Sequence, residues 1–354
     1  MNRIKVKRML AAAAGALVLT GVVLAADISG AGATFPYPIY SKWADAYKQQ
    51  TGIGLNYQSI GSGGGIKQIK AKTVTFGASD MPLKPDELKE AGLVQFPMII
   101  GGVVPVVNIK GVGANQLVLD GPTIASIYLG EITKWDDPRI KKLNPKLALP
   151  STNIAPIYRS DGSGTNFLFS NYLSSTSPKF QSSVGAATSV QWPVGIGAKG
   201  NEGIANMTRQ TDGAIGYVEY AYAKQTQMAT AQLINKAGKA VIPNAESFQA
   251  AAANADWAHA DGYYLILTDQ AGAQSWPITG ASFILVYSTP PDPVATNEAL
   301  KFFDWAYKNG GKMASELDYV PLPDPLIKQV RATWKSQIKG ATVASTADPQ
   351  RTKA

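Results

Sequence analysis

The chain of 354 residues contains no cysteine and one histidine, His259. It therefore lacks convincing parts for a zinc site or a Ser-His-Asp triad. Only 16% of the residues are charged whereas 45% are hydrophobic, a balance that favours packed globular domains over disorder. The basic residues behind the formal charge of +8 are scattered and do not alternate with aromatic residues, so nucleic acid is not an expected partner.

The N-terminus has the composition of an export signal. Four basic residues, Arg3, Lys5, Lys7 and Arg8, precede an apolar run from Met9 to Leu24. We interpret residues 1–25 as a signal peptide, cleaved after Ala25 or Ala26. An uncleaved anchor is the alternative, but about 16 apolar residues are few for a membrane span.

No later segment reaches the length of a transmembrane helix, and without cysteine no lipid can be attached to an N-terminal cysteine. We therefore expect a protein that is free in a Gram-negative periplasm.

Short strand-like and helix-like segments alternate from residue 27 to about 107. This alternation predicts a parallel sheet flanked by helices, with ligands beyond the carboxyl ends of the strands. Two long apolar strands, Met98–Ile109 and Ser282–Tyr287, could each cross between two lobes.

The predicted architecture is therefore an α/β protein of two lobes. Residues 26–107 plus 282–340 would form a discontinuous lobe I, and residues 108–281 an inserted lobe II. The polar, small-residue-rich tail, residues 341–354, is predicted to be disordered.

The segment Arg159–Asn166 has the composition of an anion site. It follows a strand-like run, Ile154–Tyr158, and leads into a helical pattern over Thr165–Leu173. A helix start offers unpaired N–H groups, and an arginine adds a forked cation. Asp161, two residues after Arg159, either orients the guanidinium toward a ligand or forms a surface ion pair of little worth.

Three further segments place small residues at a strand end: Gly30–Pro36, Ile60–Gly65 and Phe76–Asp80. Each alone is most simply an ordinary turn or helix cap. Together with an arginine they indicate a dry pocket lined by N–H groups and hydroxyls.

Asp80 is unusual in an anion site because a carboxylate repels an anion unless it accepts a proton from it. At neutral pH inorganic phosphate is present as its monobasic and dibasic ions, and both carry a P–OH group, whereas sulfate carries none. Asp80 therefore favours phosphate over sulfate. A helix cap before Met81 and Pro82 is the alternative reading of this residue.

Motifs for catalysis are incomplete. Gly61–Lys67 resembles a phosphate loop, but Ile66 and Gln68 stand where a glycine and a hydroxyl residue are required. Gly195–Gly200 matches a dinucleotide fingerprint, but it follows Trp192-Pro193, a poor context for a strand leading directly into the motif. A binding protein for phosphate, a phosphoesterase, and a binder of sulfate or molybdate stay open at this point.

Several long segments resemble the family of periplasmic phosphate-binding proteins of high-affinity phosphate ABC transporters (PstS). They are Gly30–Pro36, Phe76–Asp80, Arg159–Thr165, Gly213–Ala223, Trp276–Thr279 and Phe302–Tyr307. The likeness extends from about Ile28 to Gly340.

The resemblance implies a type II-like fold, with phosphate in the cleft between two α/β lobes, and a non-catalytic import function. It implies ligand contacts at Thr34, Phe35, Ser62, Asp80, Arg159, Ser163, Gly164 and Thr165, with Asp161 as the partner of the arginine. Tyr158 and Thr75 replace residues that some members carry as arginine and an acid, and neither position is a ligand contact.

For partners, the resemblance implies an inner-membrane permease of two subunits with two ATPase subunits, and a free protein that is monomeric. It implies no cofactor and no metal.

Overall fold

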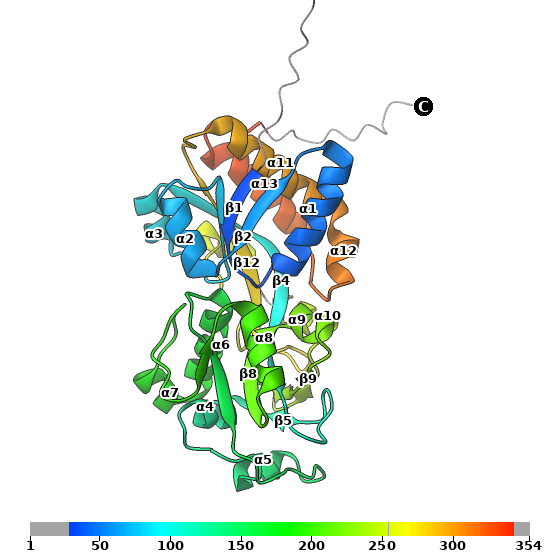
Figure 1. Cartoon of the computed structure of the whole chain (residues 1–354). Helices are drawn as coiled ribbons and strands as arrows, with labels where there is room; N and C mark the ends of the chain where they lie inside the picture. The colour runs from blue at the N-terminus through cyan, green and yellow to red at the C-terminus, as the bar shows by residue number, and fades with distance from the viewer. Residues whose placement is uncertain (1–27, 254, 343–354) are drawn as a thin grey trace, which may run out of the picture.

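The structure is a computed structural model that describes residues 28–253 and 255–342. The predicted signal peptide and residues 343–354 of the tail lie outside this range. Two lobes are stacked along the long axis of the molecule, and one strand, β4 (Leu93–Val107), runs through both (Figure 1).

The upper lobe in Figure 1 combines the N-terminal and C-terminal parts of the described chain. Its further strands are β1 (Ile28–Gly32), β2 (Leu55–Ser59), β3 (Phe76–Ser79) and β12 (Thr279–Tyr287). Its helices are α1 (Tyr37–Thr51), α2 (Ser62–Lys70), α3 (Pro85–Ala91), α11 (Pro293–Asn309), α12 (Gly311–Ser315) and α13 (Asp324–Gln337).

The lower lobe is built from the middle of the chain. Its strands are β5 (Val118–Leu119), β6 (Ala155–Arg159), β7 (Ile196–Ala198), β8 (Ala214–Glu219), β9 (Ala229–Thr230), β10 (Gln232–Ile234) and β11 (Ala240–Val241). Its helices are α4 (Gly121–Tyr128), α5 (Pro138–Leu143), α6 (Gly164–Thr176), α7 (Pro178–Ser183), α8 (Gly200–Gln210), α9 (Tyr220–Gln225) and α10 (Ala245–Ala252). Two short 3₁₀ helices, η1 (Trp257–His259) and η2 (Asp261–Tyr263), follow α10.

A single sheet extends through both lobes in the order β2-β1-β3-β12-β4-β8-β6-β7, with β9 also paired to β4. β1 is parallel to β2 and β3, and β6 is parallel to β7 and β8, whereas β12 and β8 run antiparallel to β4. A smaller sheet has the order β11-β10-β5. The prediction of an α/β fold with two lobes is confirmed.

Helix α1 illustrates how the sequence positions these elements. Ile39, Tyr40, Trp43 and Tyr47 recur at helical spacing, and all four are buried. Gly52 ends the helix in the left-handed region at φ 78°, and its N–H donates to the carbonyl of Lys48. This agrees with the helix predicted from the sequence.

Strand β4 begins five residues earlier than the strand predicted to start at Met98. Pro97 lies inside the strand, although proline cannot donate a ladder hydrogen bond. The structure accommodates it at a bulge: Ile99 is opposite Ser282, and Pro97 is opposite Phe283, so Met98 is the extra residue. The start at Met98 was therefore wrong.

Within the described residues, no helix has both the length and the apolar character required to cross a bilayer.

Candidate functional site

The carboxyl end of β6 carries the cation of the site. The Arg159 side chain is 1% exposed, and it donates to Asp161 through Nε and Nη2, at 2.7 Å from Oδ1 and 2.6 Å from Oδ2. Burial alone would raise the pKa of Asp161, but the hydrogen bonds and charge of Arg159 lower it. A pair this buried does not fit the reading of a surface ion pair. Asp161 instead holds one edge of the guanidinium, and the third nitrogen, Nη1, is buried without a partner.

Helix α6 begins directly beyond this arginine. Ser163 is its N-cap, and the Ser163 hydroxyl oxygen accepts from the N–H of Asn166 at 3.0 Å. Ser163, Gly164 and Thr165 are all buried, so the positive end of the helix dipole faces the protein interior. The sequence-based expectation of a helix start beside a forked cation is confirmed.

The upper lobe contributes three strand ends. Thr34 and Phe35 lie between β1 and α1, Ser62 is the first residue of α2, and Asp80 follows β3. All four are at most 2% exposed. Asp80 does not cap a helix, because α3 begins at Pro85 with Lys84 as its N-cap. The alternative reading of Asp80 as a helix cap was therefore wrong.

Asp80 is the buried carboxyl beside these groups. Burial raises its pKa from 3.8 to about 7, although the hydroxyls of Ser282 and Ser62 and the Arg159 guanidinium act to lower it. Within the described part of the chain, neither its Oδ1 atom nor the nearby Ser282 hydroxyl has a hydrogen bond of ordinary geometry, although Ser282 is close enough to lower the Asp80 pKa. A buried carboxylate oxygen requires a donor, and its two lone pairs can accept both from Ser282 and from a ligand hydroxyl.

The upper-lobe and lower-lobe residues of the site are in direct contact. The Ser62 hydroxyl oxygen, in the upper lobe, accepts from the N–H of Gly164 in the lower lobe at 3.0 Å. The N–H of Gly63 donates to the carbonyl of Gly162 at 2.9 Å. A methyl group at Gly164 would lie 2.5 Å from both Asp80 Oδ2 and Ser62 Oγ. The eight residues predicted as ligand contacts thus lie on both sides of one interlobe contact.

The sequence of this chain matches a model of the PBP superfamily domain over residues 16–309. It is 55% identical to the phosphate-binding protein PstS of Pasteurella multocida, over 90% of this chain and 92% of that protein. The PstS of Haemophilus influenzae is 53% identical, over 88% of this chain and 94% of that protein.

The chain belongs to the PstS family.

Solved structures agree with the fold. The phosphate-binding protein of Stenotrophomonas maltophilia superposes with a TM-score of 0.68 at 22% identity, covering 91% of this chain and 98% of that chain. The resemblance to the PstS family predicted from the sequence motifs is confirmed.

Four buried side chains around the PstS-type site were not predicted as part of it. Tyr222 and Tyr319 donate from their hydroxyls to the carbonyls of Thr34 and Phe35, each at 2.6 Å. Tyr319 also donates to Glu219 at 2.7 Å, and Asn201 contacts Thr34. Tyr222 lies in the segment Gly213–Ala223 that carries the family resemblance, but no spacing in the sequence indicates its hydrogen bond to Thr34.

A glycine motif directly before Asn201 is the one feature of the sequence that points to this residue. Gly195–Gly200 was rejected as a dinucleotide fingerprint, partly because its context seemed poor for a strand. Among the described residues no strand leads into the motif, but β7 lies inside it and is followed by α8. At the site, this is a fourth strand end leading to a helix start, after those of β1, β2 and β6, and it places Asn201 beside Thr34 and Thr165.

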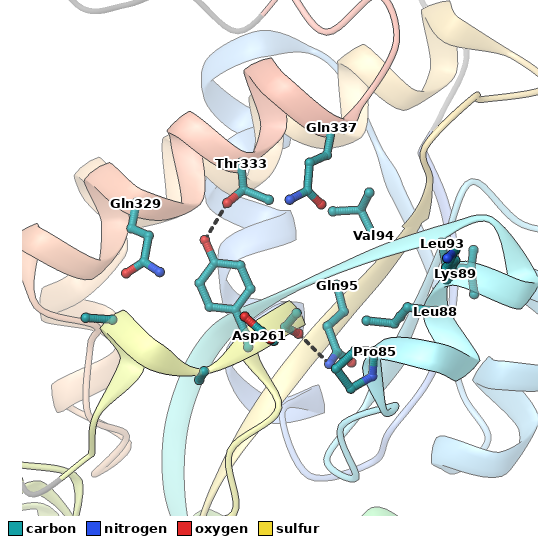
Figure 2. A pocket seen from close by; sticks show the side chains of 14 residues that line it. Pro85, Leu88, Lys89, Leu93, Val94, Gln95, Asp261, Gln329, Thr333 and Gln337 are labelled. Carbon is teal, nitrogen blue, oxygen red and sulfur yellow. Dashed lines mark hydrogen bonds between the residues drawn. The ribbon is translucent and has the colours of Figure 1, made fainter.

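A hollow of about 390 Å³ lies elsewhere, between α3, β4, η2 and α13 (Figure 2). Gln95 donates to the carbonyl of Gly262 at 2.6 Å, and Tyr263 shares a 2.7 Å hydrogen bond with Thr333. These contacts attach the segment after α10, which lies within the range predicted for lobe II, to α13 and β4. The hollow shares no residue with the interlobe site, and the lobe boundaries stay a prediction.

Proposed function

We propose that this protein binds inorganic phosphate between its lobes in the periplasm and delivers it to an ABC permease. The observation that supports this most strongly is a pair of buried groups without partners. Arg159 Nη1 is a donor and Asp80 Oδ1 an acceptor, and the Arg159 charge is close enough to lower the pKa of Asp80. A tetrahedral anion with one hydroxyl satisfies both groups at once.

The proposed ligand contacts are those carried over from the family motif. They are Thr34, Phe35, Ser62 and Asp80 from the upper lobe, and Arg159, Ser163, Gly164 and Thr165 from the lower lobe. Phe35 has an apolar side chain, so its contribution comes from the backbone. Because the contacts come from both lobes, phosphate favours the closed state over an open one.

Discrimination against sulfate follows from the charge of Asp80. The carboxylate accepts the P–OH proton of phosphate, but it leaves sulfate with a buried repulsion and an unpaired acceptor. Sites built around a ligand hydroxyl reject analogues that lack it by about 10⁴-fold or more. Sulfate and molybdate are therefore the disfavoured ligands.

A non-catalytic role is part of this proposal. Among residues 28–253 and 255–342, no group of three His, Cys, Asp or Glu side chains could hold a metal ion. Hydrolysis of a phosphoester needs an activated nucleophile or a metal-bound water, and the interlobe site offers neither in an evident form. If the purified protein released phosphate from a generic phosphomonoester with sustained turnover, with or without divalent metals, the binding-only function would be wrong.

For delivery, we propose a complex of one binding protein with two permease subunits and two ATPase subunits. The free protein would be a monomer, exported by the predicted signal peptide at residues 1–25.

Isothermal calorimetry on protein freed of phosphate tests the central claim. We expect tight binding of phosphate and binding of sulfate that is at least about 10⁴-fold weaker. Absence of phosphate binding would overturn the function. Sulfate binding within about tenfold of phosphate, or 1.4 kcal/mol, would overturn the role of Asp80 as proton acceptor.

A further inference from the structure

Asn201 connects the two halves of the site. It lies in the first turn of α8 and is 0% exposed. The residue before it, Gly200, has φ +70°, a backbone conformation that favours glycine and turns the chain from β7 into α8. The Asn201 side chain thereby contacts Thr34 of the upper lobe and Thr165 of the lower lobe.

The orientation of the Asn201 amide is fixed by the backbone. The N–H of Glu219, at the end of β8, donates to Asn201 Oδ1 at 2.8 Å. A backbone N–H can only donate, so the atom that faces it has to be the oxygen. Nδ2, which can only donate, therefore faces the two threonine hydroxyls.

This arrangement determines which way the hydroxyls donate. Thr34 Oγ1 accepts from Asn201 Nδ2 at 2.6 Å and from the Asn201 backbone N–H at 3.3 Å. A hydroxyl has two lone pairs and one hydrogen, so the Thr34 oxygen has no acceptor capacity left and its hydrogen is free to donate. Thr165 Oγ1 accepts from the same Nδ2 at 3.2 Å, which biases its hydrogen toward the site in the same way.

We infer that Asn201 is a positioning residue that sets the direction of the hydrogen bonds in the site. This inference rests on the proposed phosphate function. Asn201 occupies lone pairs of the Thr34 and Thr165 hydroxyls, so that both O–H groups donate to the phosphate oxygens. Asp80 is then left to receive the ligand proton.

The Ser62 hydroxyl oxygen also accepts two hydrogen bonds, in this case from backbone N–H groups. The donors are the N–H of Asp80, at 3.1 Å, and that of Gly164, at 3.0 Å. The Ser62 hydrogen then donates to Asp80 Oδ2, at 3.5 Å. The distinctive feature of Asn201 is that a side chain donates to one hydroxyl from each lobe.

A thermodynamic cycle on phosphate binding tests the inference. We expect Asn201→Ala to raise the Kd for phosphate at least about tenfold in the parent protein, since charged hydrogen bonds are weakened. In the Thr34→Val/Thr165→Val background the same change should alter Kd less than about twofold, because the hydroxyls through which Asn201 acts are gone. Calorimetry with phosphate up to millimolar concentration measures all four proteins.

If Asn201 only held α8 against β8, the four Kd values would show a different pattern. Asn201→Ala would then weaken binding by the same factor in both backgrounds, and this result would overturn the inference. Thr34→Val alone provides a second background, which should bind phosphate more tightly than the double valine variant. In it the effect of Asn201→Ala on Kd should lie between its effects in the parent and in the double variant. An effect as large as in the parent also contradicts the inference.

The matched control is Asn235→Ala. Asn235 is another buried asparagine, whose Nδ2 donates to the carbonyls of Gly272, Ala273 and Ser275, outside the site. Its truncation should lower the unfolding temperature and leave phosphate affinity unchanged. If the parent protein itself bound no phosphate, the proposed function would fail, whereas equal effects in the cycle would refute the role of Asn201 alone.

Discussion

The two lobes each place an aspartate at the site, and the environments of these carboxyls are opposite. Burial raises the pKa of Asp80, in the upper lobe, to about 7. Asp161, in the lower lobe, has its pKa lowered by Arg159 despite the contribution of burial. The first carboxyl is tuned to exchange a proton, and the second to remain an anion that fixes a guanidinium. One residue type thus serves two roles because only one of them has a bidentate cation.

The largest expected effect removes that cation. We expect Arg159→Ala to weaken phosphate binding by about 3 kcal/mol, the upper end for charged hydrogen bonds. Arg159 lowers the pKa of both Asp161 and Asp80, so its removal should raise both values. Calorimetry gives the affinity, and NMR titration of the carboxyl carbons gives the pKa values; unchanged phosphate affinity would remove Arg159 from the site.

Gly164→Ala tests the contact between the halves. The added methyl would lie 2.5 Å from Asp80 Oδ2 and Ser62 Oγ, so the lobes cannot approach as closely. We expect phosphate affinity to fall by about 2 kcal/mol, the typical cost of overpacking. Gly113→Ala is the control, since its methyl would come no closer than 3.5 Å to the Gln116 side chain. Equal affinities for the two variants would show that the contact is not tight.

The raised pKa of Asp80 has a consequence for stability. Between about pH 4 and 7 the Asp80 carboxyl is protonated in the folded protein but ionised in the unfolded chain. Raising the pH through this window therefore lowers the free energy of unfolding. Asp80→Asn removes this dependence. Relative to the parent, the ligand-free variant should be more stable at pH 8 than at pH 5 by about 2 kcal/mol. Urea unfolding at both pH values measures it; a pH-independent difference would mean that the pKa of Asp80 is ordinary.

The smallest expected effect is on selectivity. Asp80→Asn removes the charge that repels sulfate while keeping a carbonyl oxygen that can accept from P–OH. We expect the ratio of phosphate to sulfate affinity to narrow by about tenfold, or 1.4 kcal/mol. Competition of the two anions in calorimetry gives the ratio. An unaltered ratio would argue against the proposal that Asp80 recognises the P–OH group of the ligand.

Sequence patterns were sufficient for the parts of the site that depend on local structure. The helix start after Arg159 and the strand end before Asp80 follow from glycine, hydroxyl and apolar spacing, and both are present in the structure. Asn201 and Tyr319 were missed because their roles depend on tertiary contacts, with Tyr319 lying 284 residues from its acceptor on Phe35. Periodicity carries no information about such a pairing. The bulge at Met98 was missed for the same reason, since it is defined by the partner strand.

Strand β4 has a consequence for the cooperativity of unfolding. Its first part pairs with β12 of the upper lobe, and its last part, from Val103 to Val107, pairs with β8 of the lower lobe. Melting either lobe alone would leave part of a buried, 15-residue strand without its hydrogen-bond partner. The two lobes are therefore expected to lose structure together, as one thermodynamic unit, although each has the size of an independent domain.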